Sequence, residues 1–124
     1  MANILLATGD TRLYDVLSAE IMAEGHTIIW VADGQQAYEQ TLTGDPGLVL
    51  LDLNLPVFNA LELCGMLRGD PGVPPALPVF LLTDEDIEVH RLEKSRATGL
   101  FPKTHGVHEL RDLLAAQIKP EAMP

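Results

Sequence analysis

The chain has 124 residues, of which 47% are hydrophobic, so it can bury the core of one domain and is not a disordered segment. Eighteen acidic and eight basic residues give a formal net charge of -10, which disfavours direct binding to nucleic acids and to anionic membrane surfaces. Cys64 is the single cysteine, which excludes an internal disulfide and a cysteine-based zinc site.

The first predicted unit is a strand followed by a helix. The strand covers residues 3–7, and the helix begins at a cap formed by Asp10 or Thr11 and ends at Gly25. The side of the helix that is expected to face the core carries Leu13, Val16, Leu17 and Ile21. This order is typical of a strand with a crossover helix.

The next units repeat the same order. Strands are predicted at residues 27–31 and 48–52, and short helices follow them at residues 35–43 and 60–68, each ended by a turn that contains glycine and proline. A fourth strand is predicted at residues 77–82. The alternation of strands and helices predicts a parallel sheet in an α/β fold.

The last unit has a weaker pattern. A mostly charged helix is predicted at residues 85–97, and it is expected to be the least stable element. A short strand at about residues 100–102 contains Pro102, so it is expected at an edge of the sheet. The final helix carries the apolar residues Leu110, Leu113, Leu114 and Ile118. The domain is therefore expected to span residues 1–119, with a tail at residues 120–124.

Asp52 is the most informative residue, because it places a carboxylate at the end of the apolar run of the third predicted strand. In open parallel α/β sheets, ligands bind at the carboxyl ends of the strands, so an acid there can act while the strand stays buried. Asn54 and Pro56 favour a turn at the same place, and Asp52 would then only open that turn. Local chemistry alone leaves both interpretations open.

The order of elements, Asp52 in the segment Leu50–Pro56, Thr83 after the fourth strand and Lys103 after the fifth together resemble the receiver domain of response regulators. The likeness covers nearly the whole chain. It implies a flavodoxin-like, doubly wound sheet with strand order 2-1-3-4-5. In this family the third-strand aspartate accepts a phosphoryl group from a histidine kinase, magnesium bridges the phosphate, and the threonine and lysine bind its oxygens. By position, these roles fall on Asp52, Thr83 and Lys103.

The chain departs from the family pattern at the metal ligands. Family members carry an acidic pair directly after the first strand, where this chain has Thr8 and Gly9. The remaining candidates are Asp52 and the backbone carbonyl of Asn54. Asp10 lies one residue late and is better placed to cap the first helix. Because Mg²⁺ favours carboxylate ligands in octahedral geometry, its site is expected to be weak or absent.

Further departures surround the same cleft. Asp84 stands where the family favours a small residue, and Thr104 replaces the proline after the lysine, which removes the reason for a cis peptide. The aromatic switch position of the family falls on Leu100, or on Phe101 if the register differs by one. The loop after Asp52 lacks the usual glycines and has instead Val57, Asn59 and Ala60.

Three functions remain open. The favoured one is a degenerate receiver that acts through protein interactions, with little or no Mg-dependent phosphorylation of Asp52. The second is a conventional response regulator phosphorylated on Asp52 by a histidine kinase. The third is a flavodoxin-like protein that binds a small molecule or anion at residues 7–11, the start of the first helix. No enzymatic activity is expected in the favoured case.

The partners implied by the resemblance are a histidine kinase or a downstream effector protein. The interaction face is expected at the fourth helix, fifth strand and fifth helix, and a homodimer through this face is an open alternative. Direct contact with nucleic acid or membrane is not expected. The chain has neither an apolar run of membrane-spanning length nor the charged start of a signal peptide, and a cytoplasmic location is expected.

Overall fold

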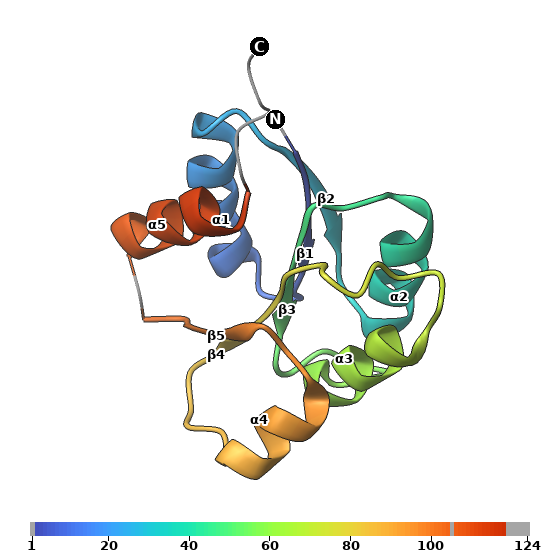
Figure 1. Cartoon of the computed structure of the whole chain (residues 1–124). Coiled ribbons are helices and arrows are strands. Elements are labelled where there is room, and N and C mark those ends of the chain that lie inside the picture. Colours follow the sequence, from blue (N-terminus) through green and yellow to red (C-terminus); the bar gives the residue numbers. More distant parts are fainter. Residues whose placement is uncertain (1, 105, 119–124) are drawn as a thin grey trace.

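The computed structural model describes residues 2–104 and 106–118. Its centre is a parallel sheet of five strands in the order β2-β1-β3-β4-β5 (Figure 1). The strands are β1 (Asn3–Ala7), β2 (Thr27–Val31), β3 (Leu48–Asp52), β4 (Val79–Thr83) and β5 (Gly99–Pro102). The helices are α1 (Thr11–Ala23), α2 (Gly34–Thr43), α3 (Ala60–Gly69), α4 (Val89–Ser95) and α5 (Val107–Gln117). The predicted flavodoxin-like fold, its strand order and the edge position of β5 are confirmed.

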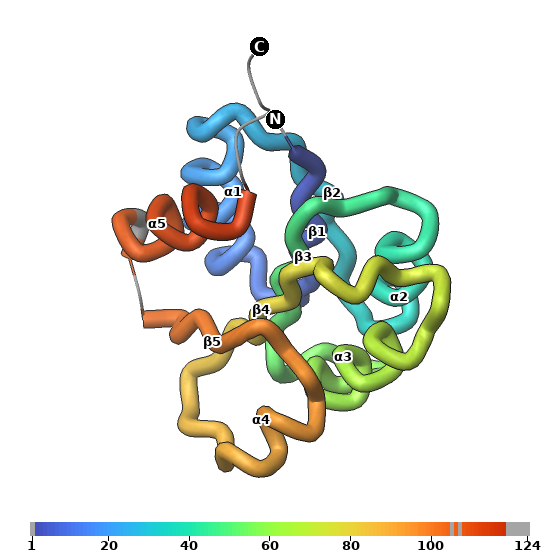
Figure 2. Tube along the Cα trace, in the orientation of Figure 1, coloured from blue at the N-terminus to red at the C-terminus, as the bar shows by residue number. Residues whose placement is uncertain are grey.

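Two apolar clusters cover the two faces of the sheet, because alternate residues of each strand point to opposite faces. In β1, Leu5 packs in one cluster with α2 and α3, and Ile4 packs in the other with α1 and α5. The picture agrees, with α1 and α5 on one side of the sheet and α2 and α3 on the other (Figure 1). The trace in Figure 2 shows β1 and β3 side by side at the centre.

The predicted core face of the first helix is wrong at one position. Leu17 and Ile21 are buried, whereas Val16 is 54% exposed. Residues four apart lie on one side of a helix, so Leu17 and Ile21 form the buried side of α1. Val16 lies next to this side and faces the solvent.

The predicted fourth helix, residues 85–97, is also wrong in its bounds, since α4 covers only Val89–Ser95. At its start, the hydroxyl of Thr83 donates to the carbonyl of Glu85 at 2.7 Å and accepts from the amide of Glu85 at 3.1 Å, which holds this segment in a turn. At its end, Arg96 takes a left-handed conformation with φ of 59° that closes the helix.

The fourth strand begins at Val79 rather than at residue 77. The amide of Leu77 donates to the carbonyl of Pro74 at 3.1 Å, so Leu77 belongs to the preceding turn. The predicted tail, residues 120–124, lies outside the described residues. Within the described part of the chain, no helix has the length and apolar character needed to cross a membrane.

Candidate functional site

The carboxyl ends of four strands bring the candidate residues to one edge of the sheet. Asp52 is the last residue of β3, a strand buried at every position. The neighbouring strand β1 ends one residue before Thr8, and β4 ends with Thr83 on the other side. Lys103 follows β5. The topology therefore places Asp52, Thr83 and Lys103, the residues predicted to take part in phosphoryl transfer, at the same edge.

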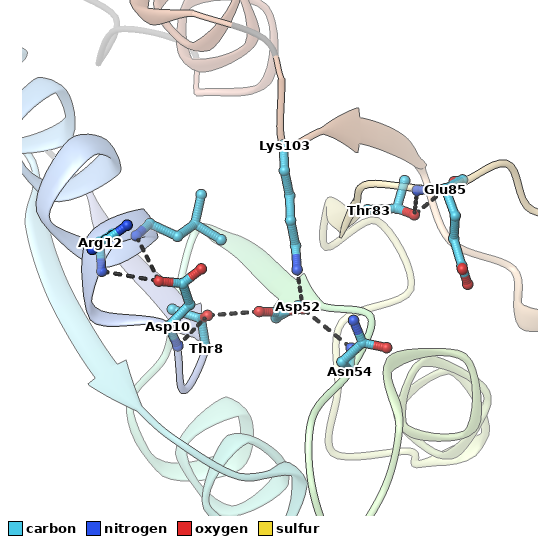
Figure 3. A network of polar contacts seen from close by, with 9 residues as sticks. Thr8, Asp10, Arg12, Asp52, Asn54, Thr83, Glu85 and Lys103 are labelled. Atoms are coloured by element: carbon cyan, nitrogen blue, oxygen red, sulfur yellow. Dashed lines mark hydrogen bonds and ion pairs between the residues drawn. The ribbon is translucent and has the colours of Figure 1, made fainter.

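The carboxylate of Asp52 is surrounded by hydrogen-bond donors (Figure 3). The ammonium of Lys103 lies 2.7 Å from Oδ1, and the side chains of the two residues are only 15% and 7% exposed. The backbone amide of Asn54 donates to Oδ1 at 3.1 Å, and the hydroxyl of Thr8 donates to Oδ2 at 2.7 Å. Each carboxylate oxygen is thus bonded within the protein, and the buried negative charge is paired with a positive one.

The sequence did not predict Thr8 as a site residue. It was noted only because it stands where family members carry one residue of the acidic pair after the first strand. Its side chain is fully buried, and its hydroxyl also accepts a hydrogen bond from the amide of Asp10 at 3.0 Å. The strand register could have found the contact. Ala7 pairs with Leu51 in the parallel ladder, so the next residues, Thr8 and Asp52, are neighbours.

Lys103 reaches Asp52 across the end of β4. Its own amide donates to the carbonyl of Thr83 at 2.7 Å, which extends the pairing of β5 with β4 by one bond. The peptide that joins Lys103 to Thr104 is trans, in keeping with the absence of a proline. The lysine therefore enters the cleft without the cis peptide that the family resemblance implied.

Asp10 lies at the start of α1 and caps it. Its Oδ1 accepts from the amides of Arg12 at 3.0 Å and Leu13 at 3.2 Å. This is the geometry of an N-cap, as the sequence favoured. Among residues 2–104 and 106–118, no group of three or more His, Cys, Asp or Glu side chains is arranged to hold a metal ion.

Thr83 is buried at the site but faces away from Asp52. Its hydroxyl is bonded to the backbone of Glu85, and Figure 3 shows this pair apart from the contacts of Asp52. Beside it lies a cavity of about 350 Å³ whose lining includes the three consecutive acids Asp84, Glu85 and Asp86. This mouth of the cleft therefore has a negative electrostatic character.

The loop between β3 and α3 is held close to α2. The amide of Gly34 donates to the carbonyl of Pro56 at 3.0 Å, and a Cβ on Gly34 would lie only 2.5 Å from the carbonyl oxygen of Phe58. Within this loop Val57 has φ of 71°, a left-handed conformation that is unusual for a β-branched residue. The loop that follows Asp52 thus combines a close approach with local backbone strain.

The two candidates for the aromatic switch position lie on opposite faces of β5. Leu100 packs with the cluster under α3 and α4, and Phe101 is 4% exposed in the cluster under α1 and α5. Neither position carries a phenol hydroxyl, as the sequence indicated.

Comparisons with known proteins identify the family of the chain. The family model described as the response regulator receiver domain matches residues 4–115. The response regulator protein PmrA of Pseudomonas aeruginosa is 37% identical over 111 residues, which is 88% of this chain and 49% of that protein. The DNA-binding response regulator MtrA of Mycobacterium tuberculosis is 39% identical over 72 residues, 58% of this chain and 32% of that protein. The chain thus spans about a third to a half of the length of these relatives.

Solved structures match over nearly the whole chain. The chemotaxis response regulator CheY4 of Vibrio cholerae has a TM-score of 0.86 at 21% identity, covering 95% of this chain and 99% of that one. The receiver domain of the sensor histidine kinase PA1611 of Pseudomonas aeruginosa, solved with magnesium in its active site cleft, has a TM-score of 0.83 at 23% identity and covers 96% of this chain and 98% of that one. At these identities the likeness concerns the fold.

Proposed function

The chain belongs to the family of response regulator receiver domains, and we propose that residues 1–119 form a signalling module whose phosphoacceptor site at Asp52 is degenerate. The observation that carries this proposal is the bonding of both Asp52 oxygens by Thr8 and Lys103. In this view the module acts through protein interactions, has no enzymatic activity of its own, and undergoes little or no magnesium-dependent phosphorylation.

The residues around Asp52 offer few of the ligands that a magnesium ion needs. Asp52 offers one carboxylate, and the hydroxyl of Thr8, already bonded to it, brings no negative charge. The carboxylate of Asp10 is engaged by the amides of α1. A dication at Asp52 would also have to displace the ammonium of Lys103, which lies at 2.7 Å. These residues do not fit Mg²⁺, whose octahedral shell usually includes more than one protein or phosphate anion.

Phosphoryl transfer to Asp52 is disfavoured for the same reasons. Hydrogen bonds and an ion pair stabilise the negative charge of a carboxylate and so lower its nucleophilicity, and developing charge on the phosphoryl oxygens needs positive partners. Asp84 adds a negative charge at the mouth, and the hydroxyl of Thr83 is bonded to Glu85. The ammonium of Lys103, the positive group beside Asp52, is already paired with the Asp52 carboxylate.

A conventional regulator, phosphorylated on Asp52 by a histidine kinase, is the second candidate. It is favoured by the joint presence of Asp52, Thr83 and Lys103 at the strand ends that the family uses. The third hypothesis, anion binding at the start of α1, is disfavoured because the side chain of Asp10 already places a negative charge on the amides there.

The proposed partners are a histidine kinase or a downstream effector, bound at the face of α4, β5 and α5. The formal charge of -10 argues against nucleic-acid binding by this segment, although MtrA is a DNA-binding response regulator. The chain spans only about a third to a half of the length of these relatives. The activities of the full-length relatives are therefore not assigned to it. A cytoplasmic location remains a prediction from the sequence.

Mass spectrometry after incubation with acetyl phosphate and Mg²⁺ tests the proposal. The wild-type protein should be labelled slowly or not at all, and Asp52→Asn should abolish any labelling. Replacing Thr8 and Gly9 by aspartate, together with Asp84→Ala, should raise the labelling rate because it restores metal ligands and removes a negative charge. Stoichiometric labelling of wild-type Asp52 would overturn the degenerate reading in favour of the conventional regulator.

A further inference from the structure

Trp30 links the exposed edge of the sheet to the candidate site. It lies in the edge strand β2, is 44% exposed, and stacks on Tyr14 of α1 with ring centroids 3.9 Å apart and an interplanar angle of 19°. Its indole Nε1 donates to the backbone carbonyl of Thr8 at 2.9 Å. The same residue, Thr8, donates its hydroxyl to Asp52.

Thr8 is therefore fixed by four hydrogen bonds. Its amide donates to the carbonyl of Val31 at 3.0 Å, and its carbonyl accepts from Trp30. Its hydroxyl accepts from the amide of Asp10 and donates to Oδ2 of Asp52. The two bonds from β2 hold the backbone of Thr8, and the backbone position determines where its hydroxyl points.

The contact of Trp30 is more specific than packing alone requires. An apolar side chain would cover Tyr14 equally well, but only a side chain with a donor at the indole position can bind the carbonyl of Thr8. The strand register places Trp30 opposite Leu6, two residues before Thr8, so the long indole reaches past the end of β1. The stacked ring of Tyr14 restricts the orientation in which it does so.

We infer that Trp30 is a positioning residue for the cleft: through the carbonyl of Thr8 it holds the Thr8 hydroxyl on Asp52, and it couples the stacked Tyr14–Trp30 pair, of which Trp30 is exposed, to the state of that carboxylate. The inference deepens the proposed function and rests on it, because Thr8 is the residue that closes Oδ2. Coupling between two sites is reciprocal, so a change at either end must be visible at the other.

The first arm of the test observes Trp30 while the site is changed. Trp30 is the only tryptophan, so the indole N–H gives one unambiguous signal in a proton–nitrogen NMR spectrum. Thr8→Val removes the hydroxyl and should move this signal upfield, toward the position of an unbonded indole. Thr8→Ser keeps a hydroxyl and should restore the wild-type position. Thr43→Val removes an exposed threonine hydroxyl on α2 and serves as the matched control.

The second arm observes the site while Trp30 is changed. Trp30→Phe keeps an aromatic ring on Tyr14 but removes the donor, and it should shift the side-chain carboxyl carbon signal of Asp52, assigned by its loss in Asp52→Asn. In a Thr8→Val background the same substitution should produce no further shift, because the path through the hydroxyl is already broken. Thermal melting of each variant verifies that the fold is retained.

The outcomes separate this inference from the proposed function. The coupling is overturned if the indole signal does not move in folded Thr8→Val. It is also overturned if the carboxyl signal of Asp52 does not change in Trp30→Phe. Both conclusions hold even if acetyl phosphate does not label wild-type Asp52. Equal shifts from Trp30→Phe with and without the Thr8 hydroxyl also overturn it, because Trp30 would then act by another route. Efficient labelling of Asp52 by acetyl phosphate defeats the degenerate site but leaves the measured coupling standing.

Discussion

At the scale of single residues, the buried pair of Asp52 and Lys103 should dominate the energetics of the cleft. Asp52→Asn leaves the Lys103 ammonium, 15% exposed, without its anion and should lower the free energy of unfolding by about 2–4 kcal/mol. Adding Lys103→Met removes the remaining charge and should recover much of this loss. Urea denaturation at neutral pH measures both. A double variant that is as unstable as the sum of the single variants would contradict this account.

Val57 is the second residue whose conformation predicts a measurable effect. Its φ of 71° is costly for a β-branched side chain, and the side chain is 64% exposed, so little burial is lost when it is removed. Val57→Gly should raise the free energy of unfolding by about 0.5–1 kcal/mol, after the greater freedom of glycine in the unfolded chain is subtracted. Val57→Ala keeps a Cβ and is the control. Equal stability of the glycine and alanine variants would show that the backbone is not strained.

The residue scale also shows what sequence reasoning reaches. Asp52, Thr83 and Lys103 were located correctly at strand ends, because each apolar strand stops at a recognisable place and parallel strands share one active edge. The hydrogen bond from Thr8 and the rotation of Thr83 toward Glu85 depend on side-chain directions and on a local turn. The register of the parallel strands makes Thr8 a neighbour of Asp52, but the apolar pattern does not tell where the hydroxyls of Thr8 and Thr83 point.

At the scale of elements, one side-chain contact joins α2 to the loop after α3. The phenol of Tyr38 donates to the carboxylate of Asp70, and the amide of Gly72 donates to its other oxygen at 2.8 Å. The hydrogen bond with Tyr38, followed by that with Gly72, lowers the pKa of Asp70 below its usual value. A carboxyl whose pKa is lowered by folding stabilises the protein above its unfolded pKa, and this contribution is lost as the pH falls through the folded pKa.

Tyr38→Phe should therefore raise the pKa of Asp70 toward its ordinary value and reduce stability at neutral pH. The difference from wild type should shrink in acid, below the pKa of Asp70, because protonation removes the same interaction in the wild-type protein. An NMR titration of Asp70 and thermal melting at several pH values measure these effects. Tyr14→Phe, whose hydroxyl is remote from Asp70, is the control. A stability difference that stays constant into acid would assign the effect to packing instead.

Elements were predicted well where the local sequence determines them. The bounds of β1, β2 and β3 agree with the predicted ones, since each is a compact apolar run between turn residues. The fourth helix was predicted too long, because its charged sequence permits helix while the Thr83–Glu85 turn and the left-handed Arg96 restrict it. The turn at Thr83–Glu85 and the backbone conformation of Arg96 set the limits of this helix.

At the scale of the whole molecule, the site and the α4-β5-α5 face lack a clear connection through phosphate. Lys103 already supplies a positive charge beside Asp52. Position 100 is a leucine, so it has no phenol that could change position when Asp52 is phosphorylated. Binding of a partner at that face should therefore not depend on phosphate. In pull-downs from the native cell extract, wild type, wild type treated with acetyl phosphate and Mg²⁺, and Asp52→Asn should capture the same partner to a similar extent. Assays below the melting temperature of Asp52→Asn separate loss of binding from loss of fold.

Two exposed apolar residues on opposite sides of the molecule provide the matched controls for this face. Val89 of α4 is 67% exposed and Met22 of α1 is 56% exposed. Val89→Glu should abolish capture, because a charge in the centre of a contact must be desolvated, whereas Met22→Glu should leave capture unchanged. If Met22→Glu abolished capture and Val89→Glu did not, the partner would bind at the α1 side, where the Tyr14–Trp30 pair lies. Loss of the partner in folded Asp52→Asn, with Val89→Glu behaving as expected, would show that the carboxylate controls the face and that the site still works as a switch.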